Sequence, residues 1–150
     1  AASDVYKRQP VTQPDSDGGP IYSLDGGAAT IPFLRYAGSS FLGQILEVFV
    51  QERGAADRLT EVYQTSMAEG LKAMLLERPG LAWLPQTVVD EELGRGKLVP
   101  AGGADWEINL EVRLYRARDN RRNKVDRLWQ QSSRPWPTSP SPSKDGARLR

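Results

Sequence analysis

The sequence contains neither cysteine nor histidine. Without cysteine the chain can form no disulfide and offers no thiolate nucleophile. Without histidine it lacks an imidazole general base and the central member of a Ser-His-Asp triad. Zinc-finger ligand sets need the same two residue types and are therefore excluded as well. Most common hydrolase chemistries are thus ruled out within this chain.

Long apolar runs are also missing. No run of about eighteen apolar residues occurs, and the first residues carry no apolar stretch typical of a signal peptide, so we expect no transmembrane helix and a cytoplasmic protein. The net charge is only +1, which gives no bulk sign of nucleic-acid binding. The 150 residues, 39% of them hydrophobic and 26% charged, suffice for one ordinary domain with a packed core.

The two ends of the chain differ in composition from the middle. Residues 1–9 (AASDVYKRQ) resemble the translated sequence of an adapter used to build sequencing libraries, so we expect a non-native segment and exclude it from the fold. Residues 132–150 hold four prolines and five serines, which disfavour helix and central strand. We predict that 132–150 is a disordered or non-native tail and that the chain is an internal fragment of a longer gene.

The middle of the chain alternates between strand and helix patterns. Residues 10–31 are rich in glycine and other turn-forming residues and are predicted to be mostly loop. Short apolar or alternating runs predict strands at 31–36, 59–63, 80–84, 97–100 and 108–115. Apolar residues at helical spacing predict helices at 41–54, 66–78, 86–93 and 120–131. This order is typical of an α/β fold with a parallel or mixed sheet and helices on both faces.

Two of the predicted strand-to-helix turns carry hydroxyl groups. Ser39 and Ser40 precede one helix, and Thr65 and Ser66 precede the next. Unpaired amides and the positive end of the dipole attract anions at helix N-termini, and in open α/β sheets such turns border the ligand crevice. Each serine could instead only cap its helix, and Ser66 has the capping-box spacing to Glu69. Two such turns facing one crevice favour a site for a small polar or anionic effector.

Other features have simpler interpretations. No Walker or dinucleotide phosphate-binding motif is present. Glu91 and Glu92 are adjacent, point to different helix faces and are interpreted as solvated surface charges. Residues 113–127 carry seven Arg or Lys against two Asp, a pattern that could contact phosphates but is more typical of a solvated helix face or an intersubunit surface. Met67 and Met74 share the predicted buried helix face, and Met67 could also be oxidised to the sulfoxide.

Three stretches together resemble the effector-binding domain of LysR-type transcriptional regulators: residues 31–49, 65–100 and 110–129. The most specific part is GLAWLP at 80–85, followed by a helix and by GKLV at 96–99. Within that family the sequence is most similar to the hypochlorite-responsive branch. The resemblance implies a periplasmic-binding-protein-like α/β fold, in which two subdomains hold an effector in the cleft between them, and a winged helix-turn-helix that this chain lacks.

By this resemblance, residues 10–131 are a partial effector-binding domain. Residues 31–99 are expected to form its second subdomain, complete, and 107–131 the returning strand and helix of the first. The positions that match the cleft lining of the family are Ser39, Ser40, Phe41, Thr65, Ser66 and Met67. The early part of the first subdomain is absent, so we expect the fragment neither to bind operator DNA nor to hold effector tightly.

The expected function is therefore the effector-sensing domain of a bacterial DNA-binding transcription regulator, not an enzyme, with no cofactor and no metal. Its partner would be a small polar or anionic effector, or an oxidant, and lobe closure would change the spacing of the DNA-reading helices. DNA would be bound only through the missing N-terminal domain, the full-length form is expected to be a homo-oligomer, and no membrane contact is expected. The alternative is a periplasmic solute-binding protein of the same fold, which an upstream signal peptide would favour. A small enzyme is the least favoured reading.

Overall fold

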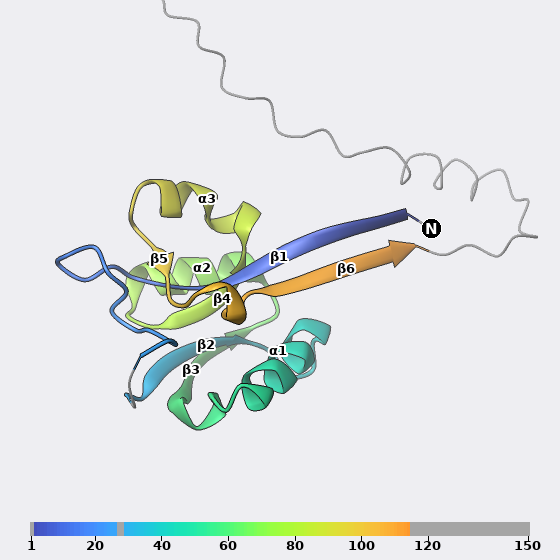
Figure 1. Ribbon diagram of the computed structural model, residues 1–150, viewed down its shortest axis with the longest axis horizontal. Coiled ribbons are helices and arrows are strands. Elements are labelled where there is room, and N and C mark those ends of the chain that lie inside the picture. Colours follow the sequence, from blue (N-terminus) through green and yellow to red (C-terminus); the bar gives the residue numbers. More distant parts are fainter. Residues whose placement is uncertain (1, 27–28, 115–150) are drawn as a thin grey trace, which may run out of the picture. The chain divides into compact units, whose positions relative to one another are not determined.

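A computed structural model describes residues 2–26 and 29–114 (Figure 1). The chain divides into two compact units, one of them Val5–Glu111 and the other Ala1–Asp4 with Val112–Arg150. Val5–Glu111 contains the helices and the sheet core, whereas only strand ends of the second unit are described. The helix predicted at 120–131 and the tail predicted at 132–150 lie outside the described residues.

The described residues form six strands, three helices and two short 3-10 turns. The strands are β1 (Ala2–Thr12), β2 (Ile31–Tyr36), β3 (Leu59–Thr65), β4 (Leu81–Pro85), β5 (Val99–Pro100) and β6 (Ile108–Leu114). The helices are α1 (Phe41–Glu52), α2 (Ala68–Glu77) and α3 (Gln86–Gly94). The 3-10 turns are η1 (Ala56–Arg58) and η2 (Ala104–Trp106).

The sheet is mixed, as the sequence predicted. Its strand order is β3-β2-β4-β1-β5, and β6 pairs with β1. Strand β2 runs parallel to both β3 and β4, whereas β1 runs antiparallel to β4 and β5. The chain crosses from β2 to β3 through α1 and then returns past β2 to β4 through α2. Because both crossovers are expected to be right-handed, these opposite directions place α1 and α2 on opposite faces of the sheet (Figure 1).

The core on the α1 side centres on Trp83 of β4, which is only 1% exposed. Its ring packs edge-on against Phe33 of β2, with 5.7 Å between ring centroids, and against Phe49 of α1, with 6.3 Å. The indole nitrogen donates a hydrogen bond of 2.8 Å to the backbone oxygen of Trp106. All of Leu81–Leu84 is buried, so the prediction of a fully buried strand here is confirmed.

Strand β1 contradicts the exclusion of 1–9 from the fold, whereas the described residues between Thr12 and Ile31 form no helix and no named strand, so the prediction that 10–31 is mostly loop is confirmed. Residues 8–12 pair with β4 in antiparallel register, ending at Thr12 opposite Leu81. Pro10 lies inside the sheet, where its carbonyl oxygen accepts from the amide of Ala101 at 2.9 Å, and as a proline it has no backbone N–H to be left unpaired. Thr12 is fully buried and donates to the oxygen of Gly80 at 2.7 Å. The adapter origin of residues 1–9 stays a prediction.

Helices α2 and α3 are joined by a partly buried ion pair. The ammonium of Lys72 lies 3.2 Å from the Glu92 carboxylate and donates to the oxygen of Val88 at 3.1 Å. The hydrogen bond to Glu92 raises the pKa of Lys72, and a backbone hydrogen bond together with Lys72 lowers the pKa of Glu92. The interpretation of Glu92 as a solvated charge is therefore wrong, whereas Glu91 is exposed and pairs with Arg95 on the same helix surface. In the part of the chain that the structure describes, no helix is long and apolar enough to cross a membrane.

The first turn of α1 lies directly on the chain that leaves β2. A β-carbon added at Gly43 would overlap the carbonyl oxygen of Ala37 and lie 2.8 Å from its carbonyl carbon. We therefore expect Gly43→Ala to lower the free energy of unfolding by about 1–3 kcal/mol, because backbone rather than a flexible side chain must move. Urea denaturation followed by circular dichroism measures this change.

Gly94, the last residue of α3, provides the matched control. An added β-carbon there meets no described atom within 4 Å, so Gly94→Ala should be neutral or stabilising by up to about 1 kcal/mol. Equal losses in the two variants would show that the contact between Gly43 and Ala37 does not constrain α1.

Candidate functional site

The two hydroxyl-bearing turns leave the sheet side by side. Strands β2 and β3 are parallel neighbours whose last residues, Tyr36 and Thr65, are paired in register. The amide of Ala37 donates to the backbone oxygen of Thr65 at 3.0 Å, so a hydrogen bond joins the first residue after β2 to the last residue of β3. From this edge the chain enters α1 on one face and α2 on the other, which makes it a topological switch point of the kind where α/β sheets bind ligands. The structure thus brings the predicted turns together.

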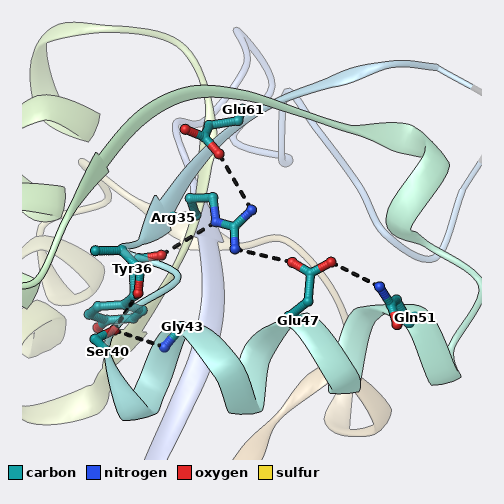
Figure 2. Close-up of polar contacts among 8 residues, drawn as sticks. Arg35, Tyr36, Ser40, Gly43, Glu47, Gln51 and Glu61 are labelled. Atoms are coloured by element: carbon teal, nitrogen blue, oxygen red, sulfur yellow. Dashed lines mark hydrogen bonds and ion pairs between the residues drawn. The ribbon is translucent and has the colours of Figure 1, made fainter.

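Ser40 is the N-cap of α1, and its hydroxyl is engaged within its own turn (Figure 2). The Ser40 hydroxyl accepts from the amide of Gly43 at 3.0 Å and donates its proton to the backbone oxygen of Ala37 at 2.6 Å. Ser39, one residue earlier, is exposed. Capping therefore accounts for Ser40, and Ser39 supplies the hydroxyl that faces solvent in this turn.

The N-terminus of α2 is built differently, and the predicted capping box is wrong. Helix α2 begins at Ala68 with Met67 as N-cap, and no described side chain makes a cap hydrogen bond to it. Ser66 lies one residue too early, and Glu69 instead lies 3.7 Å from the ammonium of Lys72. The hydroxyl oxygen of Thr65 accepts from the amide of Met67 at 3.4 Å, one residue before the helix starts. The first-turn amides of α2 consequently lack the side-chain acceptor that Ser40 supplies to α1.

The two turns also carry exposed apolar side chains. Phe41 is 73% exposed and Met67 is 67% exposed, the highest values for large hydrophobic residues among the described side chains. The prediction that Met67 lies on the buried face is wrong, because α2 starts after it and its own buried residues are Leu71 and Leu75. Met74 packs partly buried against the core, as predicted.

An ion cluster that the sequence analysis missed holds α1 against the edge of the sheet (Figure 2). The guanidinium of Arg35 lies 3.1 Å from the carboxylate of Glu47 on α1 and 3.4 Å from that of Glu61 on β3. The other oxygen of Glu47 accepts from Gln51 at 2.9 Å. Arg35 thereby links β2, α1 and β3 next to the two turns. The sequence signal for this cluster was Arg35 itself, because a single cation in the otherwise apolar strand β2 indicates an anionic partner on a neighbouring element.

Tyr36 closes β2 beneath the site. Its ring is 1% exposed, and its hydroxyl has no hydrogen-bond partner among the described residues. Burial raises the pKa of Tyr36, and the positive charge of Arg8 acts in the opposite direction. The residue stays a neutral phenol at physiological pH and serves as a packed anchor for the turn that follows it.

The arrangement offers hydrogen-bond donors and apolar side chains for binding a ligand. Within residues 2–26 and 29–114, no three acidic side chains gather into a group that could hold a metal ion. The groups on offer are first-turn amides, the hydroxyls of Ser39, Thr65 and Ser66, and two apolar side chains. Backbone amides at a helix N-terminus bind anions and polar acceptors.

The different use of the two serines gives a stability prediction. Ser40→Ala should lower the free energy of unfolding by about 1 kcal/mol, because the amide of Gly43 loses its acceptor. Ser39→Ala, one residue away and exposed, should change it by less than about 0.5 kcal/mol. Thermal and urea unfolding of both variants measure the difference, and indistinguishable variants would remove the cap assignment.

The sequence matches one protein-family model and is similar to two curated proteins. The family model described as the LysR substrate binding domain matches residues 18–134. The HTH-type transcriptional regulator YjiE of Escherichia coli (strain K12) is 26% identical over 122 residues, which cover 81% of this chain and 39% of that protein. The HTH domain-truncated transcriptional regulator QseD of Escherichia coli O157:H7 is 25% identical over 122 residues, covering 81% of this chain and 49% of that protein.

A solved structure supports the fold. Full-length HypT from Salmonella typhimurium, described as a hypochlorite-specific LysR-type transcriptional regulator, superposes with a TM-score of 0.73 at 21% identity, over 89% of this chain and 44% of that one. The chain thus spans less than half the length of these relatives.

Proposed function

This chain belongs to the LysR substrate binding domain family, and on that premise we propose that it is the effector-sensing domain of a bacterial transcription regulator. The predicted family is confirmed by the match over residues 18–134, and the predicted α/β, periplasmic-binding-protein-like fold by the mixed sheet and the structural likeness. Both curated relatives are transcriptional regulators, which favours this reading over a solute-binding protein.

The observation that carries the proposal is the uncapped N-terminus of α2 beside the turn that follows β2. A small polar or anionic effector would accept hydrogen bonds from the amides of the first turn of α2, where no described side chain competes. The hydroxyls of Ser39, Thr65 and Ser66 border the same edge. In this proposal Ser40 shapes the turn, and Phe41 and Met67 flank the effector.

The role of the domain in a longer protein follows from this site. An effector held at the switch point changes the balance between open and closed arrangements of two lobes, and DNA is bound by a separate domain. The assigned ranges are 10–131 for the partial effector-binding domain, 31–99 for the second subdomain and 107–131 for the return of the first. The proposed regulator is cytoplasmic and has no enzymatic activity.

The proposal also includes a homo-oligomer, and α1 offers the surface that favours it. A pocket along the outer side of α1 is lined by Phe41, Gln44, Ile45, Val48, Phe49 and Glu52. Val48 in this pocket is 55% exposed, and contiguous exposed apolar side chains are typical of an interaction surface. A second copy of the regulator would cover the part of this strip around Val48, whereas Phe41 at its end flanks the effector.

Anion binding to the 150-residue chain tests the proposed site. On titration with sodium sulfate at constant ionic strength, we expect the amide resonances of Ala68, Glu69 and Gly70 to shift in nitrogen–proton correlation spectra. The amide of Gly43 should not shift, because Ser40 already occupies it. Shifts scattered over the surface, or none in the first turn of α2, would contradict the proposal.

A substitution that supplies an uncharged N-cap acceptor tests the same site from the protein side. Met67→Asn places a side-chain acceptor at the N-cap and should weaken sulfate binding at least about fivefold, because the amides are then satisfied internally. Leu76→Asn, at an exposed position near the other end of α2, is the control and should leave binding unchanged.

An oxidant is the second kind of effector that the site supports, because the Met67 thioether is 67% exposed. Limited treatment with hypochlorite should convert Met67 to the sulfoxide before Met74, which is partly buried against the core. Peptide mass spectrometry measures both residues in one sample. Met67 oxidised no faster than Met74 would remove this form of sensing.

A further inference from the structure

Two exposed aspartates of the described residues are followed directly by glycine, at Asp17–Gly18 and Asp25–Gly26, whereas Asp145–Gly146 lies outside the described part of the chain. An aspartyl carboxyl group can react with the amide nitrogen of the next residue. Glycine permits this reaction because it has no β-carbon to shield that nitrogen and its backbone adopts many conformations. The two described pairs are the same dipeptide, so their reactivity depends on how freely each carboxyl group approaches the amide.

The loop that carries Asp25 is held by hydrogen bonds from three directions. One oxygen of its carboxylate accepts from the indole nitrogen of Trp106 at 2.8 Å, and the other accepts from the amide of Gly103 at 2.9 Å. The guanidinium of Arg58 donates to three backbone oxygens of the same loop, those of Ser23 at 3.0 Å, Leu24 at 3.1 Å and Gly26 at 2.6 Å. Hydrogen bonds to a charged acceptor are the stronger kind, so this carboxyl group is fixed in place.

The loop that carries Asp17 lacks these restraints and projects from the sheet after β1 (Figure 1). The Asp17 carboxylate forms no hydrogen bond or ion pair with any residue that the structure describes. Gly18 has a φ of +84°, and a β-carbon added there would meet no atom within 4 Å. The Gly18 amide donates a single neutral bond of 3.2 Å to the backbone oxygen of Asp15. Both reacting groups are therefore accessible, in an exposed loop where local opening is easy.

From this contrast we propose that Asp17–Gly18 is a site of spontaneous isoaspartate formation, unrelated to the effector site, and that the fold protects Asp25–Gly26. The nitrogen of Gly18 attacks the side-chain carboxyl carbon of Asp17 and forms a C–N bond, while the carboxyl hydroxyl and the amide proton leave as one water molecule. Water then adds to the former backbone carbonyl carbon of the resulting succinimide and breaks its bond to nitrogen. One water is released and one is consumed, so no oxidant or cofactor takes part.

The product changes the loop and creates a new chemical group. Isoaspartate inserts one extra carbon into the backbone, whereas the bonds that close the loop, from Asp15 to Gly19 at 2.7 Å and from Gly18 to Asp15, require the normal length. The paired part of β1 ends at Thr12 and should keep its register. The free α-carboxylate of the product is the group that isoaspartyl methyltransferases methylate, so such an enzyme is a specific probe for it.

Ageing of the 150-residue chain at physiological pH and temperature tests the proposal. Chymotrypsin cleaves after Tyr22 and separates the two sites, and backbone fragmentation in the mass spectrometer locates isoaspartate in each peptide. We expect isoaspartate at Asp17 to form at least about tenfold faster than at Asp25, where two charge-assisted hydrogen bonds must break first. In urea that unfolds the chain, the two rates should agree within about twofold, because the restraints are then lost.

Two variants test the two loops separately. Asp17→Glu keeps the charge but would have to close a larger ring, so it should abolish both isoaspartate and methyl acceptance in the peptide that contains position 17. Trp106→Phe removes the indole donor and should raise the rate at Asp25 at least about threefold without changing the rate at Asp17. Circular dichroism verifies that both variants fold, and the comparison of folded with unfolded wild-type chain requires neither of them.

Each contrary outcome overturns a stated part of the proposal. Equal rates at Asp17 and Asp25 in the folded chain would show that the two loops do not differ in reactivity. A tenfold difference that persists in urea would show that the neighbouring sequence, and not the fold, determines the rates. An unchanged rate at Asp25 in folded Trp106→Phe would remove the hydrogen bond to the carboxylate as the protecting contact. Sulfate binding at α2 is measured separately and is unaffected by any of these results.

Discussion

The parallel pairing of β2 with β3 determines where every candidate ligand group lies. Because Tyr36 and Thr65 are in register, the chain leaves both strands at the same level, and the amide of Ala37 is bonded to the oxygen of Thr65. Glycine at position 43 lets α1 settle directly on that chain, since a β-carbon would overlap the oxygen of Ala37. A slip of one residue in this register would exchange the two faces of β3 and separate the turns. Sheet register, more than any single side chain, therefore assembles the site.

The two helix N-termini that meet there look alike in sequence and differ in chemistry. Ser40 uses its hydroxyl inside its own turn, accepting from Gly43 and donating to Ala37. Met67 has no side-chain oxygen at the equivalent position, so the first-turn amides of α2 remain open to another acceptor. A protein generally loses about 1 kcal/mol of stability when it omits an N-cap. An uncapped helix at a topological switch point is thus a small sacrifice of stability at the place where a ligand would restore the lost hydrogen bonds.

Local periodicity predicted the elements whose residues determine their own structure. Strand β2 has the predicted bounds, and α1 begins at the predicted Phe41, because their apolar spacing and turn residues agree with one conformation. Strand β1 was missed because residues 1–9 resemble an adapter sequence and were excluded from the fold, and because its pairing with β4, about seventy residues away, leaves no local signal. The burial of Glu92 and the Arg35 cluster likewise depend on partners from other elements, which no periodicity encodes. For the site, the sequence correctly placed the two turns together. It could not show that Ser40 caps α1 while α2 has no side-chain cap, because α2 starts one residue later than a cap by Ser66 would require.

The proposed effector site is open on one side. The turns after β2 and β3 form one wall only, and the exposure of Phe41 and Met67 measures how open that wall is. Ligand pockets usually enclose most of the surface of a small molecule, so an effector resting here would still have one side in water. The curated relatives are more than twice as long as the part that matches this chain, which leaves room for an opposing wall. An effector shifts an equilibrium only by its differential affinity for the two arrangements. A contact with the effector that forms only in the closed arrangement would provide that difference, whereas hydrogen bonds to the first-turn amides of α2 would be held equally in both.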